Sequence, residues 1–74
     1  MDIVAERGKT YGDPRPNLER TAALWSAILG HPVTAHQVAL CMVAVKVSRA
    51  VASPGHADNY TDIAGYAEIA KRLA

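Results

Sequence analysis

The first helical pattern of apolar positions falls at residues 17–29. Asn17 precedes it as a suitable N-cap, because its short side chain can accept a hydrogen bond from the first free backbone amides. Gly30 and Pro32 follow it and favour termination. Apolar residues recur there every three or four positions, which places them on one face of a helix: Leu18, Ala22, Trp25 and Leu29.

A second helix is predicted over residues 35–52. Thr34 and Gln37 have the spacing of a capping box, in which each side chain bonds to the backbone amide of the other residue. The helix is apolar on nearly every side until Lys46, and a helix of that kind is normally buried. We therefore expect it at the centre of a bundle or in an oligomer interface.

The third helix is predicted over residues 59–73, after a turn at residues 53–57. Pro54 and Gly55 suit the two central positions of a type II turn. At about 100° per residue, Asp62 falls almost directly below Ile69 and Leu73 on the apolar face. This aspartate is therefore not expected to be a simple surface charge.

These patterns predict an all-α fold in which residues 1–74 form one domain. Residues 1–16 contribute a short helix at 2–8 and a loop that carries Gly12, Pro14 and Pro16. The chain has 74 residues and 14 of them are alanine, so three helices alone bury a small core. We expect self-association to complete a three-helix bundle, as a homo-oligomer of two or four copies.

Charge and composition narrow the classes of partner. The net charge is +1, which argues against a nucleic-acid interface because such surfaces are normally strongly basic. Cys41 is the only cysteine, as expected in a reducing compartment. No signal-peptide pattern opens the sequence, and its longest uninterrupted apolar run, residues 38–45, is too short to span a membrane. These features predict a protein of a reducing, cytosolic compartment that does not act at a membrane.

Four charged residues are the main candidates for chemistry. Asp58 and Asp62 lie four residues apart on the third helix, and Lys46 and Arg49 lie three apart on the second. Helices joined by a short turn bring such side chains face to face. In one interpretation they form a structural ion-pair network in which Asp58 also caps its helix. In the other, the two aspartates bind Mg²⁺ while Lys46 and Arg49 contact phosphate.

The chain resembles a family of small phage proteins that is frequent in phages of actinobacteria. Residues carrying the resemblance include the loop Tyr11–Pro14, the pair Leu24–Trp25, the Lys46-x-x-Arg49 spacing, and the stretch from Asp58 through Asp62 to Tyr66. It covers nearly the whole chain. By this resemblance we expect a phage-encoded protein in the host cytoplasm.

A more distant similarity is to the MazG-like all-α nucleoside triphosphate pyrophosphatases. That resemblance implies an oligomeric helical bundle with Mg²⁺ held by helix-borne carboxylates, here Asp58 and Asp62. In a nucleotide-binding protein of this kind, Lys46 and Arg49 are expected to contact phosphates, and Tyr11 or Trp25 is expected to contact the base. The paired glutamates expected on an earlier helix are missing, since the helix at 17–29 carries only Glu19.

Two functions follow from these residues. The first is a degenerate MazG-like nucleotide-binding protein or nucleotide pyrophosphatase. The second is a non-enzymatic phage accessory protein that binds itself or a host protein, with the Asp/Lys/Arg cluster serving structure. The missing glutamates favour the second function and the family likeness favours the first, so the sequence leaves open whether the protein is an enzyme.

Overall fold

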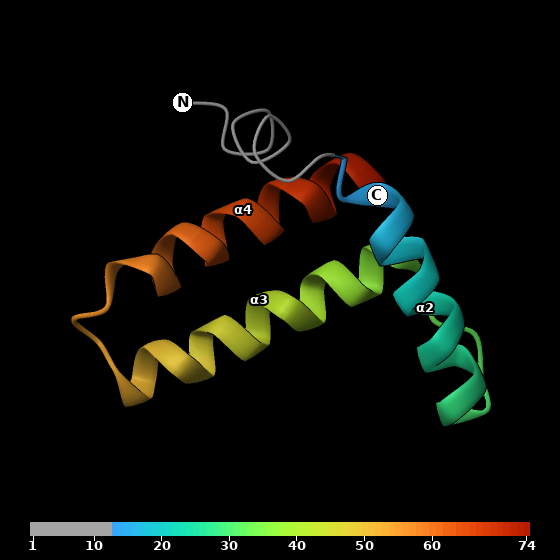
Figure 1. Ribbon diagram of the computed structural model, residues 1–74, viewed down its shortest axis with the longest axis horizontal. Helices are drawn as coiled ribbons and strands as arrows, with labels where there is room; N and C mark the ends of the chain where they lie inside the picture. The colour runs from blue at the N-terminus through green and yellow to red at the C-terminus, as the bar shows by residue number, and fades with distance from the viewer. Residues whose placement is uncertain (1–12) are drawn as a thin grey trace.

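The computed structural model describes residues 13–74, and this part of the chain contains three helices and no strand (Figure 1). They are α2 (Arg15–Leu29), α3 (Ala35–Ala52) and α4 (Ala57–Leu73). The predicted all-α class is confirmed. The helix predicted at residues 2–8 and the loop with Tyr11 lie outside the described residues.

Helix α2 begins two residues earlier than the sequence pattern indicated. Pro14 is its N-cap and makes no side-chain capping bond, so the predicted cap at Asn17 is wrong. Two other features support this start. Asp13 Oδ1 accepts a hydrogen bond from the Arg15 amide at 3.0 Å. Pro16 occupies the first turn, where the missing amide hydrogen of proline costs nothing.

Helix α3 occupies the range expected, and its capping box is confirmed. The Thr34 hydroxyl accepts a hydrogen bond from the Gln37 amide at 3.1 Å, and the Gln37 side chain accepts one from the Thr34 amide at 2.9 Å. The loop before it is also fixed, because the Val33 amide donates to Ser26 Oγ at 2.8 Å. Gly30 ends α2 with φ of 75°, a conformation that favours glycine.

Helices α3 and α4 form an antiparallel hairpin, and α2 crosses the end at which α3 begins and α4 finishes (Figure 1). His36 Nδ1 lies 2.8 Å from the Ala70 carbonyl and ties the two hairpin helices together at that end. The buried apolar core gathers there from all three helices: Leu18, Ala22, Val38, Ala39, Ile69 and Ala70.

The arrangement is open for a chain of this length. Its radius of gyration is 12.8 Å, whereas a compact domain of the same length would have about 11 Å. Many large apolar side chains remain exposed on α2 and α3, including Ile28 at 78% and Val51 at 79%. Helix α3 was expected at the centre of a bundle or in an oligomer interface. In this chain it packs on α4 and in part on α2, and large apolar side chains on the rest of its surface are exposed.

Helix α3 also has the length and composition that a membrane span requires. Its 18 residues have a mean hydropathy of 1.2. The buried core helix of a soluble protein can meet the same criterion, but only 11% of this window of α3 is buried. Two cations lie in α3, and one of them, Lys46, pairs with a carboxylate of α4.

Candidate functional site

The contact between Lys46 and Asp62 is the central polar feature of the α3–α4 interface. Lys46 Nζ lies 3.0 Å from Asp62 Oδ2, and the two side chains are 20% and 22% exposed. Asp62 faces α3 because it shares the inner face of α4 with Ile69. The ion pair compensates for moving both charges largely out of water, which would otherwise cost several kcal/mol.

The neighbouring candidates are arranged differently. Asp58 lies in the first turn of α4, where its side chain is 83% exposed and its Oδ2 is 3.7 Å from His56 Nε2. The N-cap of α4 is His56, so the predicted cap at Asp58 is wrong. The helix begins at Ala57 and leaves Asp58 inside the first turn, where its charge still favours the helix dipole. Arg49 is exposed and forms no ion pair with a carboxylate of residues 13–74.

The arrangement bears directly on the two interpretations of the carboxylates. Among residues 13–74, no three histidine, cysteine, aspartate or glutamate side chains gather where they could hold a metal ion. Mg²⁺ prefers six oxygen ligands and can use waters for several of them, but one of the two candidate carboxylates is engaged by a lysine ammonium group. Of the four charged residues that the sequence predicted to lie face to face, the structure pairs Lys46 with Asp62.

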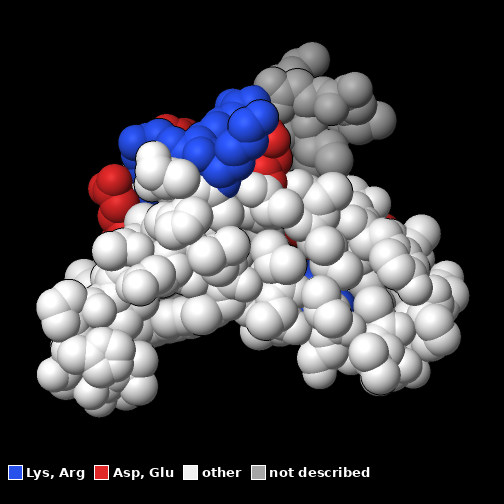
Figure 2. Space-filling model, turned by 180° about the vertical axis from the view of Figure 1, so that it is seen from behind, with Lys and Arg blue, Asp and Glu red and all other residues white. Residues whose placement is uncertain are grey.

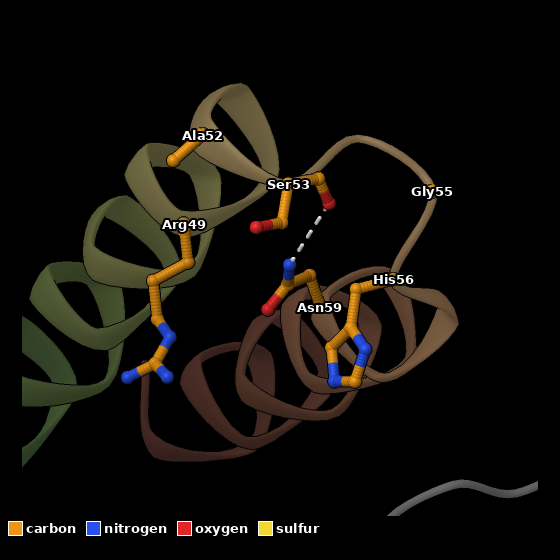
Figure 3. Close-up of a pocket in the computed structure, with 6 residues that line it drawn as sticks. All are labelled: Arg49, Ala52, Ser53, Gly55, His56 and Asn59. Atoms are coloured by element: carbon orange, nitrogen blue, oxygen red, sulfur yellow. Dashed lines mark hydrogen bonds between the residues drawn. The ribbon is translucent and has the colours of Figure 1, made fainter.

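A hollow open to solvent lies at the turn between α3 and α4 (Figure 3). Its volume is about 680 Å³. The Arg49 side chain extends along its α3 side, and His56 and Asn59 stand opposite on α4 (Figure 3). Arg49 contributes a cationic side chain to the hollow, and His56, which also lines it, is the N-cap of α4. Its walls are Arg49, Ala52, Ser53, Gly55, His56 and Asn59.

Asn59 is the residue of this region that sequence reasoning missed. It is 5% exposed, and its Nδ2 donates to the Ser53 carbonyl at 3.4 Å. The neighbouring Tyr60 hydroxyl donates to the Pro54 carbonyl at 2.6 Å. Both side chains thus fold back onto the turn, where the predicted type II geometry is wrong. Gly30 is the only described glycine with a positive φ, so Gly55 lacks the conformation that a type II turn needs.

A second surface has little polar character. A groove of about 400 Å³ runs between the last turns of α2 and the first half of α3, with Trp25, Leu29 and Val33 on one side and Leu40 and Cys41 on the other. Figure 2 shows charged side chains gathered in one area of the visible face, while most of the rest of that face carries no charge. We call the groove and the exposed apolar residues of α2 and α3 the apolar side: Leu24, Leu29, Leu40, Val47 and Val51.

Comparison with known proteins identifies the family. Residues 2–74 match the family described as a domain of unknown function, DUF6378. The chain belongs to this family. It is 38% identical over 71 residues to the Gene 55 protein of Mycobacterium phage D29, and 38% identical over 72 residues to the Gene 55 protein of Mycobacterium phage L5. No solved structure matches it.

The match covers 96% of this chain but only 47% and 46% of the two phage proteins. This DUF6378 chain thus spans about half the length of the curated relatives that it matches. The expected membership of a phage protein family is confirmed. The more distant likeness to MazG-like enzymes, and the metal and phosphate roles that it implied, stay predictions.

Proposed function

We propose that this chain is a non-enzymatic phage accessory domain that acts by protein–protein association through its apolar side. The observation that carries the proposal is the exposure of large apolar side chains along α2 and α3. Leu24 and Leu29 are each 58% exposed, and Leu40, Val47 and Val51 are 49%, 46% and 79% exposed. Contiguous apolar surface of this kind marks sites of interaction. In this function the Lys46–Asp62 pair holds α4 on α3.

The test measures the sedimenting mass of the chain alone and in the presence of possible partner proteins. The protein, labelled at its N-terminus, is sedimented in buffer and in a mycobacterial cell extract, beside the variant Val47→Glu. We expect the wild-type chain to sediment above its own mass of 7.9 kDa in at least one of the two conditions and the variant to return to that mass. Sedimentation as a monomer in both conditions would contradict an association function.

A second candidate is nucleotide binding without turnover by a degenerate MazG-like domain. The observation that favours it is the hollow lined by Arg49, His56 and Asn59, which carries a cationic side chain. Arg49 would contact the phosphates there, and Lys46 would remain paired with Asp62. Tyr11, the third residue predicted to contact nucleotide, lies outside the described residues.

This candidate is tested with a panel of ribo- and deoxynucleoside triphosphates, each with Mg²⁺, with Mn²⁺ and without metal. Binding is followed by thermal shift and turnover by pyrophosphate release, for the wild-type chain, Arg49→Gln and Asp62→Asn. Metal-independent stabilisation that Arg49→Gln loses would support nucleotide binding. Metal-dependent pyrophosphate release that Asp62→Asn loses would support the pyrophosphatase instead, and would contradict a purely structural Asp62.

A further inference from the structure

The outward face of α3 carries an apolar stripe with the spacing of a coiled-coil seam. Its members follow one another at intervals of four, three and four residues, as the core positions of a heptad do. Exposed neutral residues flank the stripe, namely Gln37, Cys41 and Ser48. The stripe itself consists of Leu40, Ala44, Val47 and Val51, all of them exposed.

Charge does not oppose the pairing of this face with itself. The two cations of α3, Lys46 and Arg49, lie roughly 120° or more around the helix from the centre of the stripe. Lys46 is directed toward α4, where it meets Asp62. Two copies of the stripe can therefore meet without bringing like charges together, which is the usual obstacle to self-association.

The two ends of the stripe have different shapes. At its carboxyl end Val51 protrudes, with 79% of its surface exposed. At its amino end Leu40 forms part of the groove that also includes Trp25 and Leu29 of α2. A two-fold axis that crosses α3 between Ala44 and Val47 brings the protruding end of each copy to the groove of the other. Such an arrangement closes on itself and leaves no free site for further growth.

From these features, and resting on the proposed association function, we propose that the occupant of the apolar side is a second copy of this chain, paired through antiparallel α3 helices. Leu40 of each copy then lies opposite Val51 of the other, and Ala44 lies opposite Val47. The antiparallel arrangement also sets opposite helix dipoles side by side. It places the exposed apolar residues of α2 against the carboxyl half of the second α3.

The area that each copy offers to the other can be estimated from the lengths of α3 and α2. An 18-residue helix is about 27 Å long and about 10 Å wide, so α3 alone offers roughly 270 Å² of projected area. Adding the 15 residues of α2 brings the total to about 500 Å² per copy. Stable interfaces bury about 800 Å² per partner, so this contact is at the small end of the range and suits a reversible dimer.

Sedimentation equilibrium of the purified chain tests the proposal. Between about 1 and 300 µM, a range that brackets micromolar affinity, the mass should rise from 7.9 kDa to twice that value. Val47→Glu sets a carboxylate in the apolar seam of each copy, and we expect the dissociation constant to rise about 100-fold. Ala67→Glu adds the same charge to the exposed surface of α4 and should leave the dissociation constant unchanged.

The pairing direction is tested with a charge exchange. In the double variant Ala44→Lys/Val47→Glu, antiparallel helices set each lysine opposite a glutamate of the second copy, so dimerisation should recover to within about tenfold of wild type. Parallel helices would set like charges opposite each other and dimerisation would stay lost. Circular dichroism confirms that each variant is helical before it is compared.

Several outcomes would overturn the proposal. These are a mass of 7.9 kDa at every concentration, a dimer that Val47→Glu leaves intact, and a double variant that stays monomeric. A monomer that sediments with phosphatidylglycerol vesicles would show that lipid covers this face. A monomer that forms a larger complex only in cell extract would overturn the dimer and leave the association function standing, so the two claims fail separately.

Discussion

The Lys46–Asp62 pair yields the most specific prediction about the stability of the fold. Replacing Asp62 with asparagine keeps the size and the hydrogen-bonding capacity of the side chain but removes its charge. Replacing Lys46 with methionine keeps most of the apolar stem and removes the ammonium group. Together with the double variant, these changes form a cycle that isolates the interaction between the two side chains.

The expected magnitude follows from the geometry. At 3.0 Å, two unit charges attract by about 1.4 kcal/mol in a medium of dielectric constant about 80 and by about 5.5 kcal/mol at about 20. Ordering and desolvation of the side chains offset much of this attraction. Both side chains are about one-fifth exposed, between the limits of a surface pair and a buried pair, so we expect a coupling of about 1–2 kcal/mol.

Urea unfolding followed by circular dichroism measures the coupling. The cycle is best run in the Val47→Glu background at low protein concentration, where association contributes nothing to the free energy of unfolding. The free energy of unfolding falls by about 1 kcal/mol per molar urea. The urea midpoint lost on replacing Asp62 should therefore be about 1–2 M larger when Lys46 is present than when it is methionine. A coupling below about 0.5 kcal/mol, the level at which independent sites simply add, would refute the structural role of the pair.

Three further substitutions test other parts of the fold by the same unfolding measurement. Val38→Ala removes a fully buried side chain from the junction of the helices and should cost about 2 kcal/mol, whereas no loss would contradict the position of the core. Thr34→Ala breaks the capping box of α3 and should cost about 1 kcal/mol, whereas Thr61→Ala, at an exposed threonine inside α4, should change stability much less. Asn59→Ala removes the bond to Ser53 and should cost about 1 kcal/mol, while Asp58→Ala, one residue away and exposed, should change stability much less.

Much of the fold could be predicted from the sequence because its signals are local. The capping box at Thr34 and the termination at Gly30 depend on residues within one turn, and both are present. The approach of Asp62 to α3 followed from helical spacing, since an aspartate on the same face as Ile69 must meet the facing helix. Lys46 was a natural partner because it lies on the helix that precedes the turn.

Other features could not be predicted, because the sequence allows two local structures and does not show which of them is more stable. Proline in the first turn moved the start of α2 ahead of Asn17. The buried side chain of Asn59 was not anticipated, because only the path of the turn decides whether an asparagine faces its own backbone or solvent. The sequence left open whether this chain covers Val47 and Val51, since apolar periodicity marks a face to be covered but not whether the same chain or another copy covers it.

The accessibility of Cys41 tests the central claim most directly. This only thiol of the chain is exposed and lines the groove between α2 and α3, so it reports whether a partner covers the apolar side. Its rate of reaction with a thiol reagent is measured against protein concentration, and again in mycobacterial extract, for the wild-type chain and Val47→Glu. If a partner covers the apolar side, the wild-type rate falls as protein or extract is added, while the rate of the variant stays at the value of the dilute chain. Equal rates for both chains under every condition would contradict it.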